Sequence, residues 1–344
     1  MSLVSRLVHP VVQAPMAGGP STPDLAAAVS NAGGLGFLAA GYLTSDALRR
    51  QIDATRALTD RAFGVNVFVP AARPADIAIV REFEAQLAPW AAEHEVALGE
   101  PRFDDDDYDA KLAVVGAARP AVVSFAFGCP ARAVVSVLQA AGIEVWVTVT
   151  EPSEAVVAIN AGADALVAQG SEAGAHRASY VDDDREPMPL QELLRELRAA
   201  LAPAGDRVAV IAAGGLMDGA DINAVLRLGA AAAQLGTAFL LCPEAGTNAT
   251  HRRALTEERP TILTRAFTGR RARALVNAWT ARFTEDAPRA YPEIHHLTAP
   301  LRARGRELDD PDLINLWAGT GHTRARAVPA ATLVAALAGE LSDD

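Results

Sequence analysis

The sequence predicts an α/β protein built on a closed barrel of eight parallel strands, a (β/α)8 or TIM barrel, with a second, smaller and mostly helical domain. Short, continuously apolar segments alternate with helix-like segments, which is typical of repeated strand-helix units. Eight such apolar segments occur between residues 11 and 240. The chain has 344 residues. A barrel of this kind needs about 250 residues, so roughly a quarter of the chain is insertion or extension.

The predicted strands are mostly continuously apolar, as expected for strands that are buried on both faces. They are Val11–Met16, Leu35–Ala40, Phe63–Phe68, Ala121–Phe127, Glu144–Val149, Ala165–Gly170, Arg207–Gly214 and Ala231–Leu240. Helix-start signals lie between them, where a capping side chain precedes an early proline or acidic residue. These signals occur at Ser21–Asp24, Thr44–Asp46 and Glu151–Glu154.

Two segments supply the extra length. Residues 71–111 interrupt the strand-helix pattern, and residues 246–344 have helical patterns without a further strand signal. We predict that residues 1–70 and 112–245 form the barrel, and that 71–111 and 246–344 pack together over it as the smaller domain. The arginine-rich segment Thr264–Trp279 either bridges the two units or carries solvent-facing charges. The acidic run Asp104–Asp109 is interpreted as a solvated loop and not a metal site.

Composition excludes several classes of function. Half of the residues are apolar and 21% are charged, so the chain can bury a large core. The net charge of −11 leaves no basic surface for nucleic acid or for an anionic membrane. The N-terminus lacks signal-peptide order, and no apolar run reaches the roughly 18 residues of a membrane helix. Cys129 and Cys242 lie far apart, which fits reduced thiols. These features predict a cytoplasmic protein.

Barrel enzymes place their active sites in the loops after the strands. The predicted strand ends carry small residues, neutral amides and one imidazole, that of His176. The only lysine, Lys111, lies in the insertion, which excludes a strand-borne Schiff base. Glycoside hydrolysis needs two carboxylates, and the strand ends offer only Glu172. A catalytic metal needs several converging ligands, and His176 has no second histidine at a ligating spacing.

Such loops suit a large, flat cofactor that performs the chemistry itself. Gly214-Gly215 and Gly236-Thr237 follow the seventh and eighth strands, where barrels commonly hold a phosphate group. The helix after the seventh strand is expected to begin near Asp218 or Ala220, and its N-terminus adds positive partial charge. Glycine pairs also occur in ordinary turns, so the joint position of the two pairs carries the argument.

Three neutral amides and one aromatic residue complete the expected lining. Asn66, Gln169 and Gln234 each have donors and acceptors that match the polar edge of a flavin ring. Aromatic residues near the strands are expected in the core. Trp317 lies in a loop-like segment and is the aromatic candidate for an apolar pocket over the flavin.

Several segments together resemble the nitronate monooxygenases, formerly called 2-nitropropane dioxygenases, of the class I type. The segments are Gln13–Gly19 with Ser21–Pro23, Ser30–Gly36, Gly170–His176, Gln234–Thr237 and Thr268–Arg273. The resemblance extends from about residue 7 to Leu316–Gly319 and beyond. It implies an FMN-containing barrel with a smaller second domain. Such an enzyme oxidises alkyl nitronates, and in some cases nitroalkanes, with O2 to carbonyl compounds and nitrite.

The resemblance also implies site residues. His176 matches the catalytic histidine of the family. The implied FMN-binding positions are Met16, Ala17, Asn66, Gln169, Gly174, Gly214, Gly215, Gln234, Leu235, Gly236 and Thr237. Two positions depart from the family pattern: Ala175 replaces a usual glycine, and the segment 217–220 lacks an arginine often found there. Alanine lacks the freedom of glycine at positive φ, so Ala175 bears on the path of the loop near the flavin.

His176 has two interpretations. With its ordinary pKa near 6.5, an imidazole can take the α-proton of a nitroalkane or, once protonated, hold the nitronate by charge. The alternative is that His176 only closes its loop through backbone hydrogen bonds. Glu172 is interpreted as a structural partner that orients the loop or the histidine.

Three functions stay open on these grounds. The first is nitronate oxidation by O2, the second is an FMN- and NADH-dependent reduction of quinones or enoyl thioesters, and the third is a flavin-free lyase or isomerase that grips a phosphate. The expected partners are a small nitronate or nitroalkane and O2, with no nucleic acid and no membrane. A homodimer stays open as the assembly.

Overall fold

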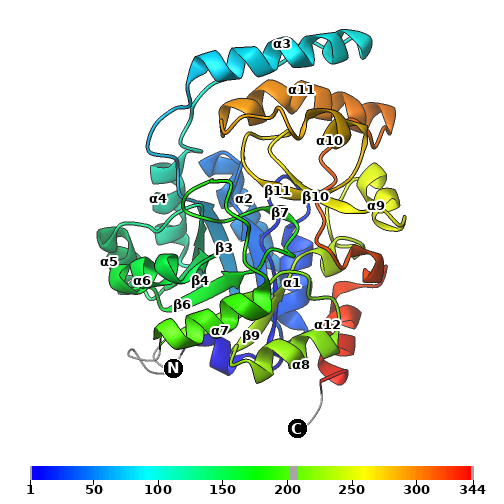
Figure 1. Cartoon of the computed structure of the whole chain (residues 1–344). Coiled ribbons are helices and arrows are strands. Elements are labelled where there is room, and N and C mark those ends of the chain that lie inside the picture. The colour runs from blue at the N-terminus through cyan, green and yellow to red at the C-terminus, as the bar shows by residue number, and fades with distance from the viewer. Residues whose placement is uncertain (1, 202–207, 342–344) are drawn as a thin grey trace.

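The computed structural model describes residues 2–201 and 208–341 and places eight parallel strands in one ring (Figure 1). Their order is β1-β9-β8-β6-β5-β4-β3-β2, and a parallel bridge between Val12 and Leu35 closes the ring between β1 and β2. The predicted TIM barrel is therefore confirmed. The strands are β1 Val11–Gln13, β2 Gly36–Ala39, β3 Phe63–Phe68, β4 Val122–Ala126, β5 Glu144–Val149, β6 Ala165–Gln169, β8 Ala209–Ala213 and β9 Ala232–Leu235.

The predicted strands overlap all eight, but several ends differ. β1 ends at Gln13, two residues before Pro15, which has no N–H group for the ladder. β9 ends at Leu235, because the chain then turns into the 3-10 helix η3, Thr237–Phe239. Arg207, the first residue of the predicted seventh strand, lies outside the described residues.

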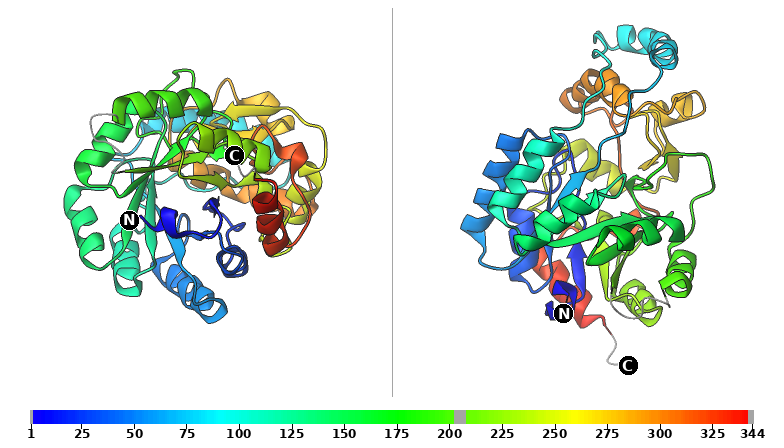
Figure 2. Two further views of the ribbon diagram at one scale, coloured as in Figure 1. Left: turned by 90° about the horizontal axis from the view of Figure 1, so that it is seen from below. Right: turned by 90° about the vertical axis from the view of Figure 1, so that its left-hand side faces the viewer.

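Helices surround the ring (Figure 2). Thr22 and Thr44 cap α1 and α2 as predicted, since their hydroxyl groups accept hydrogen bonds from backbone N–H groups. α6 begins at Pro152 as expected, although the Glu151 side chain makes no capping bond. Asp218 caps α8. The helices are α1 Pro23–Asn31, α2 Ser45–Leu58, α4 Tyr108–Ala118, α5 Arg132–Ala140, α6 Pro152–Ala161, α7 Leu190–Leu201, α8 Gly219–Arg227 and α12 Ala330–Gly339.

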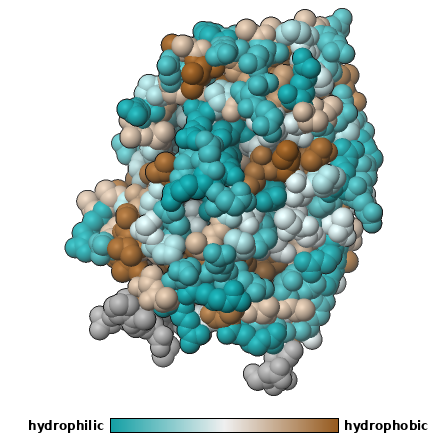
Figure 3. Space-filling view, in the orientation of Figure 1, coloured by the Kyte–Doolittle hydropathy of each residue, from teal (hydrophilic) through white to brown (hydrophobic). Residues whose placement is uncertain are grey.

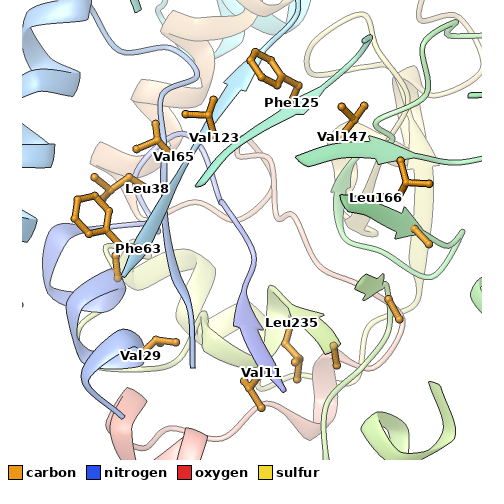
Figure 4. Close-up of a cluster of buried hydrophobic side chains, with 14 of the residues drawn as sticks. Val11, Val29, Leu38, Phe63, Val65, Val123, Phe125, Val147, Leu166 and Leu235 are labelled. Carbon is orange, nitrogen blue, oxygen red and sulfur yellow. The ribbon is translucent and has the colours of Figure 1, made fainter. Parts of the chain in front are cut away.

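Strand side chains alternate between the helices and the barrel interior, as the pleat of a strand requires. Val123 and Phe125 of β4 belong to a large apolar cluster with buried residues of the surrounding helices (Figure 4). Val122 and Trp146 belong to a second cluster, which also includes Val4 of the 3-10 helix η1, Leu3–Arg6. This second cluster fills the ring interior.

A further group of elements lies beyond the carboxyl ends of the strands (Figure 1). It includes α3 Ile77–Glu93, α9 Ala249–Leu255, α10 Ala278–Phe283 and α11 Glu293–Leu308. α3 and α11 share an apolar cluster with α10, in which Phe83, Trp279 and Leu297 are buried. The segments 71–111 and 246–344 thus contribute to one cluster, and the exact domain boundaries stay a prediction. Two helices that lie at least partly in the segments predicted to form the smaller domain pack against barrel elements: α4 contacts α2 and β3, and α12 contacts α1, α8 and β1.

The expectation of no strand after residue 245 is wrong. β10 Thr261–Thr264 and β11 Ala272–Leu275 form an antiparallel pair, and β11 also pairs with β7, Ala175–His176. Strands of four residues or fewer are too short to give a clear alternation in the sequence. Residues 170–189, between β6 and α7, carry His176 and are called the histidine loop below. The small sheet matters for function because it joins this loop to the segment that contains β10 and β11.

The acidic run before α4 is more than a solvated loop, which corrects the prediction. Asp106 accepts a hydrogen bond from the Tyr42 N–H group at 2.9 Å. The same carboxylate oxygen lies 2.7 Å from the Nζ atom of Lys111, whose side chain is fully buried. Asp104 lies 2.7 Å from the Nε2 atom of His296 on α11. The run therefore ties α4 to the loop after β2 and to α11.

The face of the molecule in Figure 3 is largely hydrophilic, with its hydrophobic residues in small, separate groups. Among the residues that the structure describes, no helix is long and apolar enough to cross a membrane.

Candidate active site

A cavity of about 550 Å³ lies at the carboxyl ends of the barrel strands. This volume falls within the roughly 300–1,000 Å³ that is typical of small-molecule sites. All of the predicted site residues line the cavity, although their roles toward a cofactor stay predictions. They are Met16, Ala17, Asn66, Gln169, Gly174, His176, Gly214, Gly215, Gln234, Leu235, Gly236 and Thr237.

Glycine backbone forms one wall of the cavity, after β8 and β9. Gly214 and Gly215 have φ angles of +123° and +71°, which side-chain-bearing residues rarely adopt. A Cβ atom on Gly215 would lie 2.9 Å from the Cβ atom of Glu172. Within the described ranges, the N–H groups of Gly215 and Gly236 donate to no protein acceptor. Such N–H groups at the strand ends of a barrel fit the anionic end of a phosphate-bearing cofactor.

Gln169 binds the histidine loop through both the oxygen and the nitrogen atom of its side-chain amide. Its Oε1 atom accepts from the Ala178 N–H group at 2.8 Å, and its Nε2 atom donates to the His176 carbonyl oxygen at 3.1 Å. Asn66 donates through Nδ2 to the hydroxyl group of Ser124 on β4 at 3.0 Å. The sequence predicted that the amides of Asn66 and Gln169 face the polar edge of a flavin ring. It did not predict that Gln169 also positions the histidine loop.

The histidine loop has little backbone freedom. A Cβ atom on Gly174 would lie 2.5 Å from the backbone nitrogen of Gly319, so only glycine fits there. Ala175 has a φ angle of +60°, in the left-handed region that favours glycine. The residue that departs from the family pattern therefore adopts the glycine conformation with a side chain. Glu172 accepts hydrogen bonds from the Leu190 N–H group at the start of α7, which is a structural role of the kind predicted for it.

The imidazole of His176 is held by Thr268. The Nε2 atom lies 2.8 Å from the Thr268 hydroxyl oxygen, which in turn lies 3.3 Å from the carbonyl oxygen of Arg270. One assignment satisfies both contacts: Thr268 donates to the carbonyl and accepts from Nε2–H. This tautomer leaves Nδ1 as the basic nitrogen. The rings of Trp317 and Phe127 lie 5.4 Å and 5.6 Å from the imidazole.

Burial lowers the pKa of His176 to about 3, and the guanidinium groups of Arg270 and Arg302 add to the effect. The imidazole is therefore neutral at physiological pH, which differs from the ordinary value assumed from the sequence. A neutral imidazole can accept a proton or share a hydrogen bond. It supplies no fixed positive charge for an anionic substrate.

Arginines from the β10–β11 region bind the histidine loop. Arg273 donates to the Ser171 carbonyl oxygen through two nitrogen atoms, at 2.7 Å and 2.9 Å. Arg270 donates through Nε to the Arg177 carbonyl oxygen at 3.2 Å. Arg265 forms ion pairs with carboxylates of the same loop. Of the two interpretations of this segment, these contacts favour the bridge over solvent-facing charges, because three of its arginines bind the loop that carries His176.

The sequence analysis missed several residues of the cavity, and Tyr42, His295 and Arg302 are the three with the clearest polar or ring contacts. Tyr42, after β2, has a φ angle of +67°, and its ring stacks on that of His295 at 4.1 Å. Arg302 donates to the His295 carbonyl oxygen at 2.7 Å and is 7% exposed. His295 and Arg302 are seven residues apart on α11, which is the spacing of one helix face. That spacing was the only sequence signal for them.

Comparison with known proteins identifies the family. The sequence profile of the family described as nitronate monooxygenase matches residues 2–340. The chain belongs to the nitronate monooxygenase family. It is 43% identical to the nitronate monooxygenase of Paraburkholderia phytofirmans, covering 96% of this chain and 92% of the relative. It is 42% identical to that of Pseudomonas aeruginosa, covering 97% and 96%. Family members are flavin-dependent oxidoreductases, so the protein is an enzyme of this class.

Solved structures agree with the family assignment. Nitroalkane oxidase from Streptomyces ansochromogenes superposes with a TM-score of 0.95 at 49% identity, covering 99% of this chain and 98% of that one. FabK from Thermotoga maritima has a TM-score of 0.75 at 25% identity, covering 98% and 94%. The nitronate monooxygenase fold is thus present over essentially the whole chain.

Proposed function

We propose that the enzyme binds FMN in the cavity and oxidises alkyl nitronates with O2 to carbonyl compounds and nitrite. The observation that carries the proposal is the convergence of the glycine backbone after β8 and β9, the strand-end amides and His176 on one cavity. The family membership and the likeness to a nitroalkane oxidase support the substrate class. When bound, the flavin supplies the redox chemistry.

Different residues of the lining suit the phosphate group, the ring and the polar ring edges of FMN. The N–H groups of Gly215 and Gly236 would bind the phosphate group, because they have no acceptor within the described part of the protein. Met16 would flank the ring. Asn66 and Gln234 would face its polar edges, since their amides both donate and accept hydrogen bonds.

His176 handles the proton in this proposal. Its neutral state and the Thr268 contact on Nε2 leave Nδ1 to accept the α-proton of a neutral nitroalkane, or to share a hydrogen bond with a preformed nitronate. Phe127 and Trp317 lie around the imidazole and provide apolar surface that excludes water. Thr268 acts as a positioning residue, because it sets the orientation of the ring.

Anaerobic mixing separates this proposal from its alternatives. We expect a nitronate alone to bleach the flavin absorbance of the purified enzyme without NADH. Bleaching by NADH at a rate comparable to turnover would instead indicate the reductase. A protein that shows no flavin absorbance after addition of FMN would indicate the flavin-free lyase or isomerase.

The variant His176→Ala tests the proton-transfer role. We expect it to retain FMN and to lose most activity on neutral nitroalkanes, with a smaller loss on preformed nitronates. Steady-state rates on both substrate forms, at matched flavin content, measure this difference. Equal losses on the two forms would argue against proton abstraction, and full activity would exclude His176 from the mechanism.

A further inference from the structure

The charged side chains that line the cavity, among the residues that the structure describes, all carry a positive charge. Among the described residues that line it, Arg302 and Arg306 are the only charged ones, and none is an aspartate or a glutamate. The chain as a whole carries a net charge of −11. Both arginines come from α11 and lie four residues apart, so α11 gives the cavity a positive wall. An anionic ligand matches this wall.

Arg302 is buried, and no carboxylate among the residues 2–201 and 208–341 pairs with it. Its side chain donates through Nη2 to the His295 carbonyl oxygen at 2.7 Å and through Nε to the Thr298 hydroxyl oxygen at 3.2 Å. The titratable groups that act on it are those of Tyr42, Tyr291 and Arg306, and none of these is anionic at neutral pH. Buried charges in proteins are normally paired. A buried guanidinium that lines a cavity without an anionic partner therefore favours binding of an anion from solution.

The bonds within the protein leave donors of Arg302 for a ligand. Nη2 lies 2.7 Å from the His295 carbonyl oxygen and 3.3 Å from the His295 Nδ1 atom, so both of its N–H groups have an acceptor on that residue. In the described part of the chain, Nη1 donates to no protein acceptor. The free Nη1 group has two N–H donors and carries part of the positive charge, so it can donate a charge-assisted hydrogen bond to an anionic oxygen atom. A nitronate is a planar anion with two such oxygen atoms on one nitrogen.

We infer that Arg302 binds the substrate's nitronate group through Nη1 and supplies the positive charge that holds this anionic form of the substrate more tightly than the neutral nitroalkane. This inference rests on the proposed function and assigns the substrate charge to a residue that the sequence analysis did not include. His176 is neutral and cannot supply that charge. Arg306 is exposed at the rim and adds only long-range attraction.

Binding of an inert anion tests the inference apart from turnover. Propanoate has the planar two-oxygen shape, and isothermal titration calorimetry on the flavin-loaded enzyme gives its Kd. We expect Arg302→Met to raise this Kd about 10- to 100-fold, the loss expected for hydrogen bonds between charged groups. Arg302→Lys keeps the charge and loses the planar guanidinium group, so its Kd should lie between those of the wild type and Arg302→Met. The matched control, Arg306→Met, removes the same charge and should change Kd less than about threefold.

Selectivity gives a second measurement. Arg302→Met should raise the KM for a preformed nitronate by the same factor as the Kd of propanoate, and it should change the KM for the neutral nitroalkane far less. If Arg302→Met does not fold with wild-type flavin content and thermal stability, Arg302→Gln and Arg302→Lys carry the same comparison.

Three results would overturn the inference. They are an unchanged Kd in a folded Arg302 variant, an equal loss in the Arg302 and Arg306 variants, and no propanoate binding by the wild-type enzyme. The failure of the proposed function has a different signature. In that case the wild type would bind propanoate through Arg302 but would not oxidise nitronates. Nitronate oxidation with an unchanged KM in Arg302→Met would refute this inference alone.

Discussion

Substitution of Ala175 by glycine should stabilise the protein, whereas most substitutions to glycine lower the free energy of unfolding. The Ala175 φ angle of +60° is left-handed, which costs a side-chain-bearing residue about 1–2 kcal/mol and costs glycine nothing. Glycine at this position raises the entropy of the unfolded chain, which offsets about 0.5–1 kcal/mol of the gain. We therefore expect Ala175→Gly to raise the free energy of unfolding by about 0.5–1 kcal/mol.

The matched control is Ala173→Gly in the same loop. Ala173 also lines the cavity, but its φ angle is not left-handed, so the substitution brings only the entropic cost. We expect it to lower the free energy of unfolding by about 0.5–1 kcal/mol. The unfolding entropy of a chain of this size is about 0.7 kcal/mol per kelvin, so either change moves Tm by only about 1 °C. Equilibrium urea unfolding, at equal flavin content, is the better measurement.

The two variants should therefore change stability in opposite directions. A loss of similar size in both would show that Ala175 bears no backbone strain. A gain in both would show that the loop prefers glycine for a reason other than the φ angle of one residue. Either result would refute the reasoning.

Two further predictions concern the histidines. Thr268→Val removes the hydrogen-bond partner of His176 Nε2, so we expect kcat on neutral nitroalkanes to fall about tenfold with little change in KM. Thr268→Ser keeps the hydroxyl group and should restore kcat. Steady-state kinetics measure both, and an unchanged kcat in Thr268→Val would show that Thr268 does not position the imidazole. Burial lowers the pKa of His176 to about 3 and that of His251 to about 4, so both stay neutral in the folded enzyme and gain a proton on unfolding below about pH 6.5. Their contribution to stability is complete above pH 6.5 and is lost as the pH falls toward 4, by about 2 kcal/mol per group between pH 6.5 and 4.5. Urea unfolding over this range should show the loss, and His251→Gln should reduce it; equal pH slopes in the variant and the wild type would contradict the assignment to His251.

The barrel was predictable because its signals are local. Buried parallel strands appear as apolar runs, and Thr22 and Thr44 mark helix starts by residue type alone. The cavity followed from the same prediction, since the carboxyl ends of all the strands meet at one end of a barrel. That rule placed Asn66 and Gln234 together although they are far apart in sequence.

The remaining features depend on contacts that local patterns do not encode. The two bonds of Gln169 to the histidine loop exist only because the loop folds back over its own strand. Arg302 reaches the cavity from α11, which belongs to no strand-helix unit. The pKa of His176 is set by burial, so an ordinary value was the only one the sequence could support. Such features require the tertiary structure.

The position of α12 has a consequence for biosynthesis. This helix packs on α1, α8 and β1, and its Leu333 and Val334 are buried there, yet it follows the last barrel strand by almost a hundred residues. During translation, α1 and α8 are synthesised before α12, so the apolar surfaces that α12 covers stay exposed until it is made. Nascent chains would therefore expose an apolar groove until α12 has left the ribosome. Chaperone binding to this groove would be expected at that stage.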